Sequence, residues 1–106
     1  MVPEISVTEL KEKMDNNDDF ILLDVREPSE VEICKIDGSV LIPLGELEER
    51  YTELDSSKEI VVQCKLGGRS ANAVAFLHSK GITNSVNLAG GIIDWANTID
   101  SRLDTY

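Results

Sequence analysis

The sequence predicts an α/β domain with a mainly parallel sheet, and three observations support this prediction. Short apolar runs rich in Val, Ile and Leu alternate with segments whose apolar residues recur at helical spacing. A length of 106 residues is typical of one domain and suffices for one hydrophobic core, so residues 1–106 are expected to form a single domain. The two cysteines are too few for a disulfide framework and do not have the spacing of a zinc site, so no metal is expected.

The first half of the chain contains signals for two helices and two strands. In chain order, the expected elements are a helix from residue 6 to about residue 16, a strand at 20–25, a helix at 28–33 and a strand at 40–42. Ser6 and Glu9 have the spacing of a capping box, and Pro28 suits the first turn of a helix. Gly38 and Pro43 bound the second strand.

The second half contains signals for three helices and two further strands. The expected elements are a helix carrying Leu47, Tyr51 and Leu54, a strand at 60–63, a helix from Arg69 to about Gly81, a short strand at 86–88 and a C-terminal helix carrying Ile92, Trp95 and Ile99. The acidic residues between Leu47 and Leu54 fit the solvated side of that helix. Gly81 suits a helix end, and Gly90 and Gly91 allow a tight turn before the last helix.

Composition narrows the classes of partner and the compartment. Twenty acidic and ten basic residues give a formal charge of −10, which argues against nucleic acid or an anionic membrane as a partner. The first residues lack the pattern of a secretion signal, and no apolar run approaches the roughly 20 residues that span a bilayer. We therefore expect a soluble protein of the reducing cytoplasm.

The strand at 60–63 leads into the segment CKLGGRS, which predicts a reactive cysteine. A strand that ends at Cys64 and turns at once into a helix directs unpaired backbone N–H groups at the sulfur and stabilises a thiolate. An isolated cysteine at the end of an apolar strand is usually a small buried residue, but this loop favours a nucleophile. The predicted site is Cys64 with the loop residues Lys65, Leu66, Gly67, Gly68, Arg69 and Ser70.

Individual loop residues have separate expected contributions. Gly67 and Gly68 would let the backbone curl closely around the sulfur. Arg69 has two interpretations of equal weight, as a side chain that binds an anionic donor or as a structural tie to an acidic neighbour. Lys65 is expected to be exposed and to raise the local potential.

Three strings in this order resemble the rhodanese family of sulfurtransferases: LLDVREPSE, CKLGGRS and NLAGGIIDW. The resemblance covers nearly the whole chain. It implies the rhodanese fold, with a central, mainly parallel five-stranded sheet flanked by helices on both faces. It also implies that Asp24 and Arg26, in the DVR pattern, form a scaffold ion pair that supports the site.

A narrower resemblance rests on LIPLGELEERYTELD, CKLGGRSANA and DSRLDTY, which are similar to the rhodanese domain of adenylyltransferase-sulfurtransferases in molybdopterin and thiamine biosynthesis. Those proteins carry a nucleotide-binding domain, whereas these 106 residues contain no phosphate loop or dinucleotide fingerprint. The chain is therefore interpreted as an excised domain or a free-standing relative.

The family resemblance implies a mechanism without metal or organic cofactor. Cys64 would take sulfur from a small anion such as thiosulfate or from a persulfide-donor protein, hold it as a persulfide and pass it to a nucleophile. Cyanide in vitro, or a ubiquitin-like sulfur carrier, would be the acceptor. An adenylyltransferase domain is the other partner that the resemblance implies.

Two other functions stay open. The first is a catalytically idle rhodanese module for protein contact, although idle members often lack the cysteine that this chain keeps. The second is a phosphatase or arsenate reductase, although the six residues from Cys64 to Arg69 form a loop one residue shorter than the related phosphatases use.

Cys34 and His78 are two residues outside the loop with side chains that could take part in chemistry. Cys34 lies in CKIDGS, where many rhodaneses read GHIPGA, and could form a disulfide with Cys64, but a passive, half-buried thiol is favoured. His78 is expected in a solvated position on its helix, so no cysteine and histidine pair is predicted.

Overall fold

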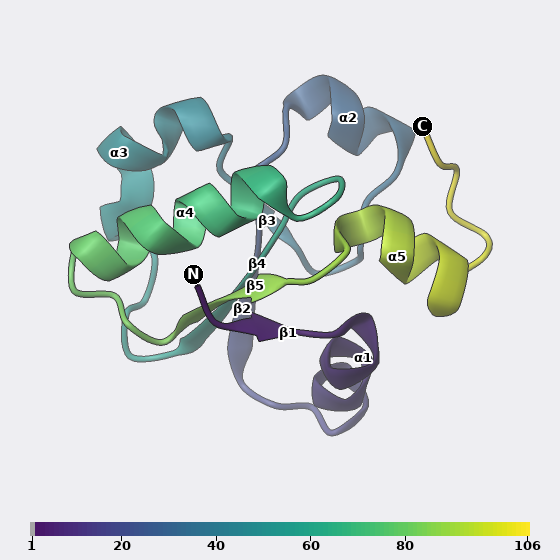
Figure 1. Cartoon of the computed structure of the whole chain (residues 1–106), viewed down its shortest axis with the longest axis horizontal. Helices are drawn as coiled ribbons and strands as arrows, with labels where there is room; N and C mark the ends of the chain where they lie inside the picture. Colours follow the sequence, from purple (N-terminus) through teal and green to yellow (C-terminus); the bar gives the residue numbers. More distant parts are fainter. Residues whose placement is uncertain (1) are drawn as a thin grey trace.

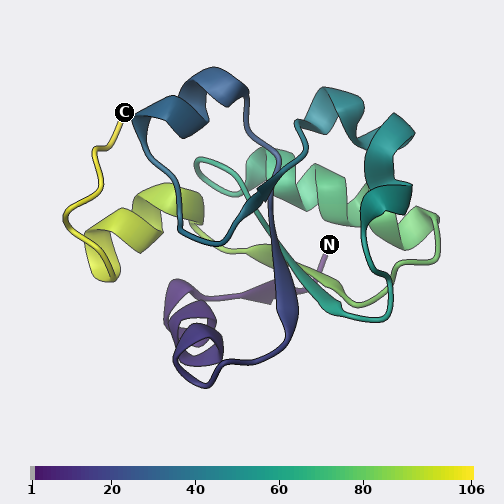
Figure 2. The same ribbon diagram turned by 180° about the vertical axis from the view of Figure 1, so that it is seen from behind.

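The computed structural model describes residues 2–106 and confirms the α/β class. Five strands form one sheet in the order β1-β5-β4-β2-β3, and all four pairings are parallel. Figure 1 shows the sheet between two layers of helices, and Figure 2 shows the same arrangement from behind. The strands are β1 (Glu4–Ile5), β2 (Phe20–Asp24), β3 (Val40–Leu41), β4 (Glu59–Gln63) and β5 (Ser85–Leu88).

The helices lie close to their predicted places. They are α1 (Val7–Asp15), α2 (Pro28–Ile33), α3 (Leu47–Arg50), α4 (Gly68–Ser79) and α5 (Gly91–Thr98), with 3-10 turns η1 (Leu44–Glu46) and η2 (Tyr51–Glu53) on either side of α3. The predicted capping box is present, because the Ser6 hydroxyl accepts from the Glu9 N–H at 3.1 Å and the Glu9 carboxylate accepts from the Ser6 N–H at 3.2 Å. Gly81 follows α4 with a φ of +84°, as a helix end requires.

Two predictions about elements need correction. The two-residue strand β1 was not predicted, because two residues are too few to show an alternating pattern. The expected continuous helix from Leu47 to Leu54 is only one turn of α-helix between two 3-10 turns. Leu44 and Leu47 are three residues apart, and so are Tyr51 and Leu54, which matches the period of a 3-10 helix.

The core lies on both faces of the sheet. On one face, Leu47 of α3 and Ala73, Val74 and Leu77 of α4 pack against the sheet. On the other face, α1 and α5 contribute Val7, Leu10, Ile92 and Trp95. Residues Ile60, Val61 and Val62 of the central strand β4 have no exposed surface, as expected of a parallel strand covered on both faces.

The architecture fixes one end of β4 as the place for chemistry. Ligands of open parallel sheets collect at the carboxyl ends of the strands, and the residue that follows β4 is Cys64. The C-terminal tail leaves α5 and returns to end beside α2, near the same end of the sheet (Figures 1 and 2). Among residues 2–106, no helix combines the length and the apolar character needed to cross a bilayer.

Candidate active site around Cys64

Cys64 places its sulfur inside a ring of hydrogen-bond donors. The Gly67 N–H donates to Cys64 Sγ at 3.1 Å and the Ser70 N–H at 3.4 Å, while the Ser70 hydroxyl lies 3.2 Å from the same atom. Gly67 has a φ of +109°, a left-handed conformation that glycine adopts without steric cost and that turns its N–H towards the sulfur. The ring forms because β4 ends directly before the loop that begins α4.

The ring lowers the pKa of Cys64 despite its burial. Desolvation acts to raise the pKa of a thiol that is only 1% exposed, because it disfavours the thiolate. Hydrogen bonds from the Ser70 hydroxyl and from the N–H groups of Ser70, Gly67 and Leu66 outweigh this effect, so the pKa lies below its ordinary value. The first turn of α4 adds the positive end of a helix dipole. These groups favour the nucleophilic form of Cys64.

The Asn87 side chain of β5 forms hydrogen bonds with the loop that follows Cys64. Its Nδ2 group donates to the Gly67 carbonyl at 3.2 Å and to Glu4 Oε2 at 3.1 Å, so its Oδ1 atom faces the Ser70 hydroxyl, which donates to it. Ser70 therefore has one hydroxyl hydrogen for two acceptors, Asn87 Oδ1 and the Cys64 thiolate. A thiol at Cys64 can donate to Ser70 Oγ, whereas a thiolate requires the Ser70 hydrogen to turn towards sulfur.

Replacing Ser70 with alanine should raise the pKa of Cys64, because the thiolate loses its hydroxyl donor while its burial remains. The measurement is the pH dependence of iodoacetamide alkylation in a Cys34→Ala background, which leaves Cys64 as the one reactive thiol. Ser79→Ala is the matched control, because this serine lies at the far end of α4 and donates to the Phe76 carbonyl. A midpoint that stays the same or falls in Ser70→Ala would contradict this assignment.

The first turn of α5 supports the loop from the other side. The Ile92 N–H donates to the Cys64 carbonyl at 2.9 Å, and the Ile93 N–H donates to the Lys65 carbonyl at 3.2 Å. Gly91, with a φ of +61°, lies against these two carbonyl groups where a side chain would not fit. The predicted tight turn at Gly90 and Gly91 is confirmed, and it also fixes the backbone of the reactive loop.

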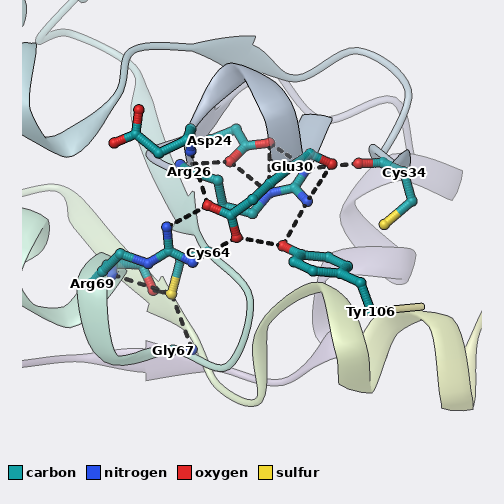
Figure 3. A network of polar contacts seen from close by, with 10 residues as sticks. Asp24, Arg26, Glu30, Cys34, Cys64, Gly67, Arg69 and Tyr106 are labelled. Atoms are coloured by element: carbon teal, nitrogen blue, oxygen red, sulfur yellow. Dashed lines mark hydrogen bonds and ion pairs between the residues drawn. The ribbon is translucent and has the colours of Figure 1, made fainter. Parts of the chain in front are cut away.

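Arg69 forms an ion pair with Glu30 of α2. Its Nη1 and Nη2 atoms donate to Glu30 Oε1 at 2.6 Å and Oε2 at 2.8 Å, in a bidentate pair (Figure 3). The hydrogen bonds from Arg69 outweigh partial burial and lower the pKa of Glu30 to about 2, with further donation from the Tyr106 hydroxyl at 2.7 Å. Of the two interpretations of Arg69, this geometry matches the tie to an acidic neighbour.

Asp24 and Arg26 form the buried ion pair that the resemblance implied. The Arg26 guanidinium donates to Asp24 Oδ2 at 2.8 Å through Nη2 and to both carboxylate oxygens through Nε, and both side chains are at most 1% exposed. Arg26 also donates to the Cys34 carbonyl at 2.8 Å and to the Tyr106 hydroxyl at 3.0 Å. Burial acts to lower the pKa of Arg26, but the hydrogen bonds with Asp24 and Tyr106 outweigh burial and raise it. The pair therefore joins β2, the end of α2 and the C-terminal tail.

The remaining loop residues differ in part from expectation. Lys65 is half-buried rather than exposed, because its ammonium lies 4.5 Å from the centre of the Tyr106 ring in a cation–π contact. Leu66 is 65% exposed at the tip of the loop. Gly68 begins α4, and an added Cβ there would meet no atom within 4 Å, so the curl of the loop depends on Gly67 and not on Gly68.

Cys34 and His78 lie apart from the sulfur ring. Cys34 is buried rather than half-buried, and Figure 3 places it across the Arg26 and Tyr106 network from Cys64. Both cysteines are free thiols. His78 is half-buried rather than solvated, because its Nε2 atom lies 2.9 Å from the Ser85 carbonyl oxygen at the start of β5. Neither residue forms a catalytic pair with Cys64.

Three contributors to the site escaped prediction: Glu30, Asn87 and Tyr106. The contacts that bring them to the site span long stretches of sequence: 39 residues from Glu30 to Arg69, 17 from Ser70 to Asn87 and 76 from Glu30 to Tyr106. Local spacing therefore does not reveal them. Each of the three residues lies in a string that carries a family resemblance: Glu30 in LLDVREPSE, Asn87 in NLAGGIIDW and Tyr106 in DSRLDTY. These resemblances were the available signal.

The site is identified by its nucleophile rather than by a cavity or a metal cluster. A broad surface hollow between α1, α5 and the tail is lined by residues such as Lys35, Trp95 and Arg102 and does not include Cys64. Within residues 2–106, no group of three or more His, Cys, Asp or Glu side chains is arranged to hold a metal ion.

Comparisons with known proteins show the family to which the chain is similar. A model of the rhodanese-like domain family matches residues 6–98. The putative sulfur carrier protein YrkF of Bacillus subtilis is 40% identical over 94 residues, which cover 89% of this chain and 51% of YrkF. A sulfurtransferase of Allochromatium vinosum is 33% identical over 96 residues, which cover 91% of this chain and 90% of that protein.

Two further matches extend the comparison. The probable adenylyltransferase/sulfurtransferase MoeZ of Mycobacterium tuberculosis is 36% identical over 104 residues, 96% of this chain and 26% of MoeZ, in agreement with the narrower resemblance. The crystal structure of a rhodanese-related protein from Thermoplasma volcanium superposes with a TM-score of 0.81 at 38% identity, covering 90% of this chain and 91% of that chain. The chain thus spans about half of YrkF, a quarter of MoeZ and most of the Allochromatium protein.

Proposed function

Because the chain belongs to the rhodanese-like domain family, we propose that it is a sulfurtransferase that carries sulfane sulfur as a persulfide on Cys64. The ring of donors around Cys64 Sγ, formed by Gly67 and Ser70, is the observation that carries this proposal. The names of YrkF and the Allochromatium protein, a sulfur carrier and a sulfurtransferase, support the same class of reaction.

The reaction has two steps, and each is a displacement at sulfur. The Cys64 thiolate attacks the outer sulfur of the donor, so that an S–S bond forms to Cys64 while the donor's own bond to that sulfur breaks and takes the electron pair. Thiosulfate would leave as sulfite, and a persulfide would leave as a thiolate. A nucleophilic acceptor then attacks the outer sulfur of the Cys64 persulfide and returns the Cys64 thiolate.

The loop would stabilise the negative charge throughout this cycle. The N–H groups of Gly67 and Ser70 donate to Cys64 Sγ, and the outer sulfur of the persulfide would lie within the same loop. The loop would stabilise negative charge on sulfur as an oxyanion hole stabilises it on oxygen. The deep position of Cys64, at 1% exposure, suits a small sulfur better than a phosphoryl group, which needs a wider ring of donors. This supports sulfur transfer over the phosphatase alternative.

Partners follow from the family as further proposals. Thiosulfate or a persulfide-donor protein would supply sulfur, and cyanide in vitro or a ubiquitin-like sulfur carrier would accept it. The match to MoeZ supports an adenylyltransferase domain as a partner in the same pathway. A reducing cytoplasm would keep Cys64 in its free form.

Thiocyanate formation from cyanide tests the proposal. Wild type is expected to turn over thiosulfate or cysteine persulfide, whereas Cys64→Ala should fall to the uncatalysed rate, because no sulfur remains to be charged. Cys34→Ala is the matched control and should retain activity, since its thiol lies outside the donor ring. Activity that survives in Cys64→Ala, or absence of turnover by wild type with both donors, would overturn the proposal and favour a protein-binding module.

A further inference from the structure

The positive charge expected from Arg69 at the reactive loop is neutralised. Glu30 accepts two hydrogen bonds from the Arg69 guanidinium, and its carboxylate is held in place by the Tyr106 hydroxyl and by the Glu27 N–H at 3.0 Å. The Glu30 side chain is 18% exposed, so this pair is less screened than a fully exposed one. Arg69 and Glu30 together contribute no net charge to the surroundings of Cys64.

The other cations near the loop do not replace Arg69. Arg26 is fully buried and is paired with Asp24, so it too contributes no net charge. Lys65 makes no ion pair within residues 2–106, but its ammonium faces the Tyr106 ring. One uncompensated lysine therefore remains beside Cys64, in a chain whose formal charge is −10.

Sulfur donors differ in the negative charge that they and their leaving groups bring into the site. Thiosulfate is a dianion, and the sulfite that leaves after attack by Cys64 is a dianion as well. A thiol persulfide carries at most one negative charge on its reacting group, and its leaving group is a single thiolate. Neutralising Arg69 removes an attraction that a dianion needs more than a monoanion, while the formal charge of −10 repels a dianion more strongly.

We propose that Glu30 determines donor specificity by neutralising Arg69, so that the site selects thiol persulfides and disfavours dianionic donors such as thiosulfate. This inference rests on the proposed sulfur transfer at Cys64. It concerns how well each donor delivers sulfur and not whether Cys64 accepts it. Glu30 acts through Arg69, from 39 residues away in the sequence.

Glu30→Gln tests this role, because glutamine keeps the size of the side chain and can still accept from Arg69 but leaves the arginine charge uncompensated. We expect kcat/KM for thiosulfate to rise about tenfold, because the substitution removes a unit negative charge near a dianion in a partly hydrated site. For cysteine persulfide, kcat/KM should change by less than about threefold. Glu32→Gln is the matched control. It removes the same charge from an exposed position of α2 and should leave both donors near wild type.

A second control separates charge from the position of the tail. Tyr106→Phe removes the hydrogen bond to Glu30 without changing the charge at neutral pH, so it should not reproduce the gain with thiosulfate. Equal effects of Glu30→Gln and Glu32→Gln on thiosulfate, or a gain in Tyr106→Phe as large as in Glu30→Gln, would overturn the inference.

Wild type alone gives an independent test that does not depend on the folding of a variant. If the site disfavours dianions, potassium chloride should raise kcat/KM for thiosulfate by screening the repulsion, and a fall with salt would contradict the inference. Intact mass distinguishes the two levels of proposal. Failure of Cys64 to gain sulfur from either donor counts against sulfur transfer itself, whereas gain of sulfur without the expected donor preference counts against Glu30 alone.

Discussion

Asp24→Asn should lower the free energy of unfolding by about 3 to 5 kcal/mol, the loss typical of breaking a buried ion pair from one side. Arg26 has no exposed surface and would keep its charge without a counterion. Asparagine can accept a hydrogen bond but cannot neutralise the guanidinium. Since small domains are stable by only about 5 to 15 kcal/mol, the variant should lose a large share of its stability.

Urea unfolding measures this effect through the fluorescence of Trp95, the single tryptophan, which is 5% exposed in the folded protein. Asp15→Asn is the matched control, because it breaks the exposed ion pair with Lys11 and should change stability by less than about 1 kcal/mol. If the two variants lost similar stability, the Asp24 and Arg26 pair would not be the structural tie described above.

Gly91→Ala should cost about 2 to 5 kcal/mol and should also displace the reactive loop. A φ of +61° disfavours any residue with a Cβ by about 1 to 2 kcal/mol, and overpacking against a fixed backbone adds about 1 to 3 kcal/mol. The added carbon would lie 2.6 Å from the Cys64 carbonyl oxygen and would also meet the carbonyl of Lys65. Relief requires the first turn of α5 to move away from the loop that it supports.

Gly81→Ala separates the two contributions to this loss. Gly81 has a similar positive φ of +84°, but an added Cβ there meets no atom within 4 Å. Its substitution should therefore cost only the conformational term of about 1 to 2 kcal/mol. A Gly91→Ala variant no less stable than Gly81→Ala would show that the contact between α5 and the loop tolerates a side chain.

Much of the fold could be predicted because its signals are local. The capping box at Ser6 and the β-branched run before Cys64 both lie in one stretch of chain and specify one element. The segment that carries Leu47, Tyr51 and Leu54 was harder, because three-residue and four-residue spacings overlap there and the structure combines 3-10 and α turns. Strand β1 exists through its pairing with β5, and the sequence of β1 does not contain that information.

The site was predictable to the same extent. Cys64 and the glycine turn at Gly67 follow from one short string, and the structure brings the expected N–H groups to the sulfur. The ion pair between Arg69 and Glu30 could not be deduced from the sequence, because it depends on how α2 packs beside the start of α4. The half-buried position of Lys65 depends likewise on the return of Tyr106 from the C-terminal tail.

The intact mass of the protein after incubation with a sulfur donor tests the central claim most directly. Wild type and Cys34→Ala should each gain one sulfur atom, which peptide mapping should place on Cys64 and which cyanide should remove as thiocyanate. Cys64→Ala should gain none. Sulfur found on Cys34 instead, or no gain by wild type with either thiosulfate or cysteine persulfide, would contradict the assignment of Cys64 as the sulfur carrier.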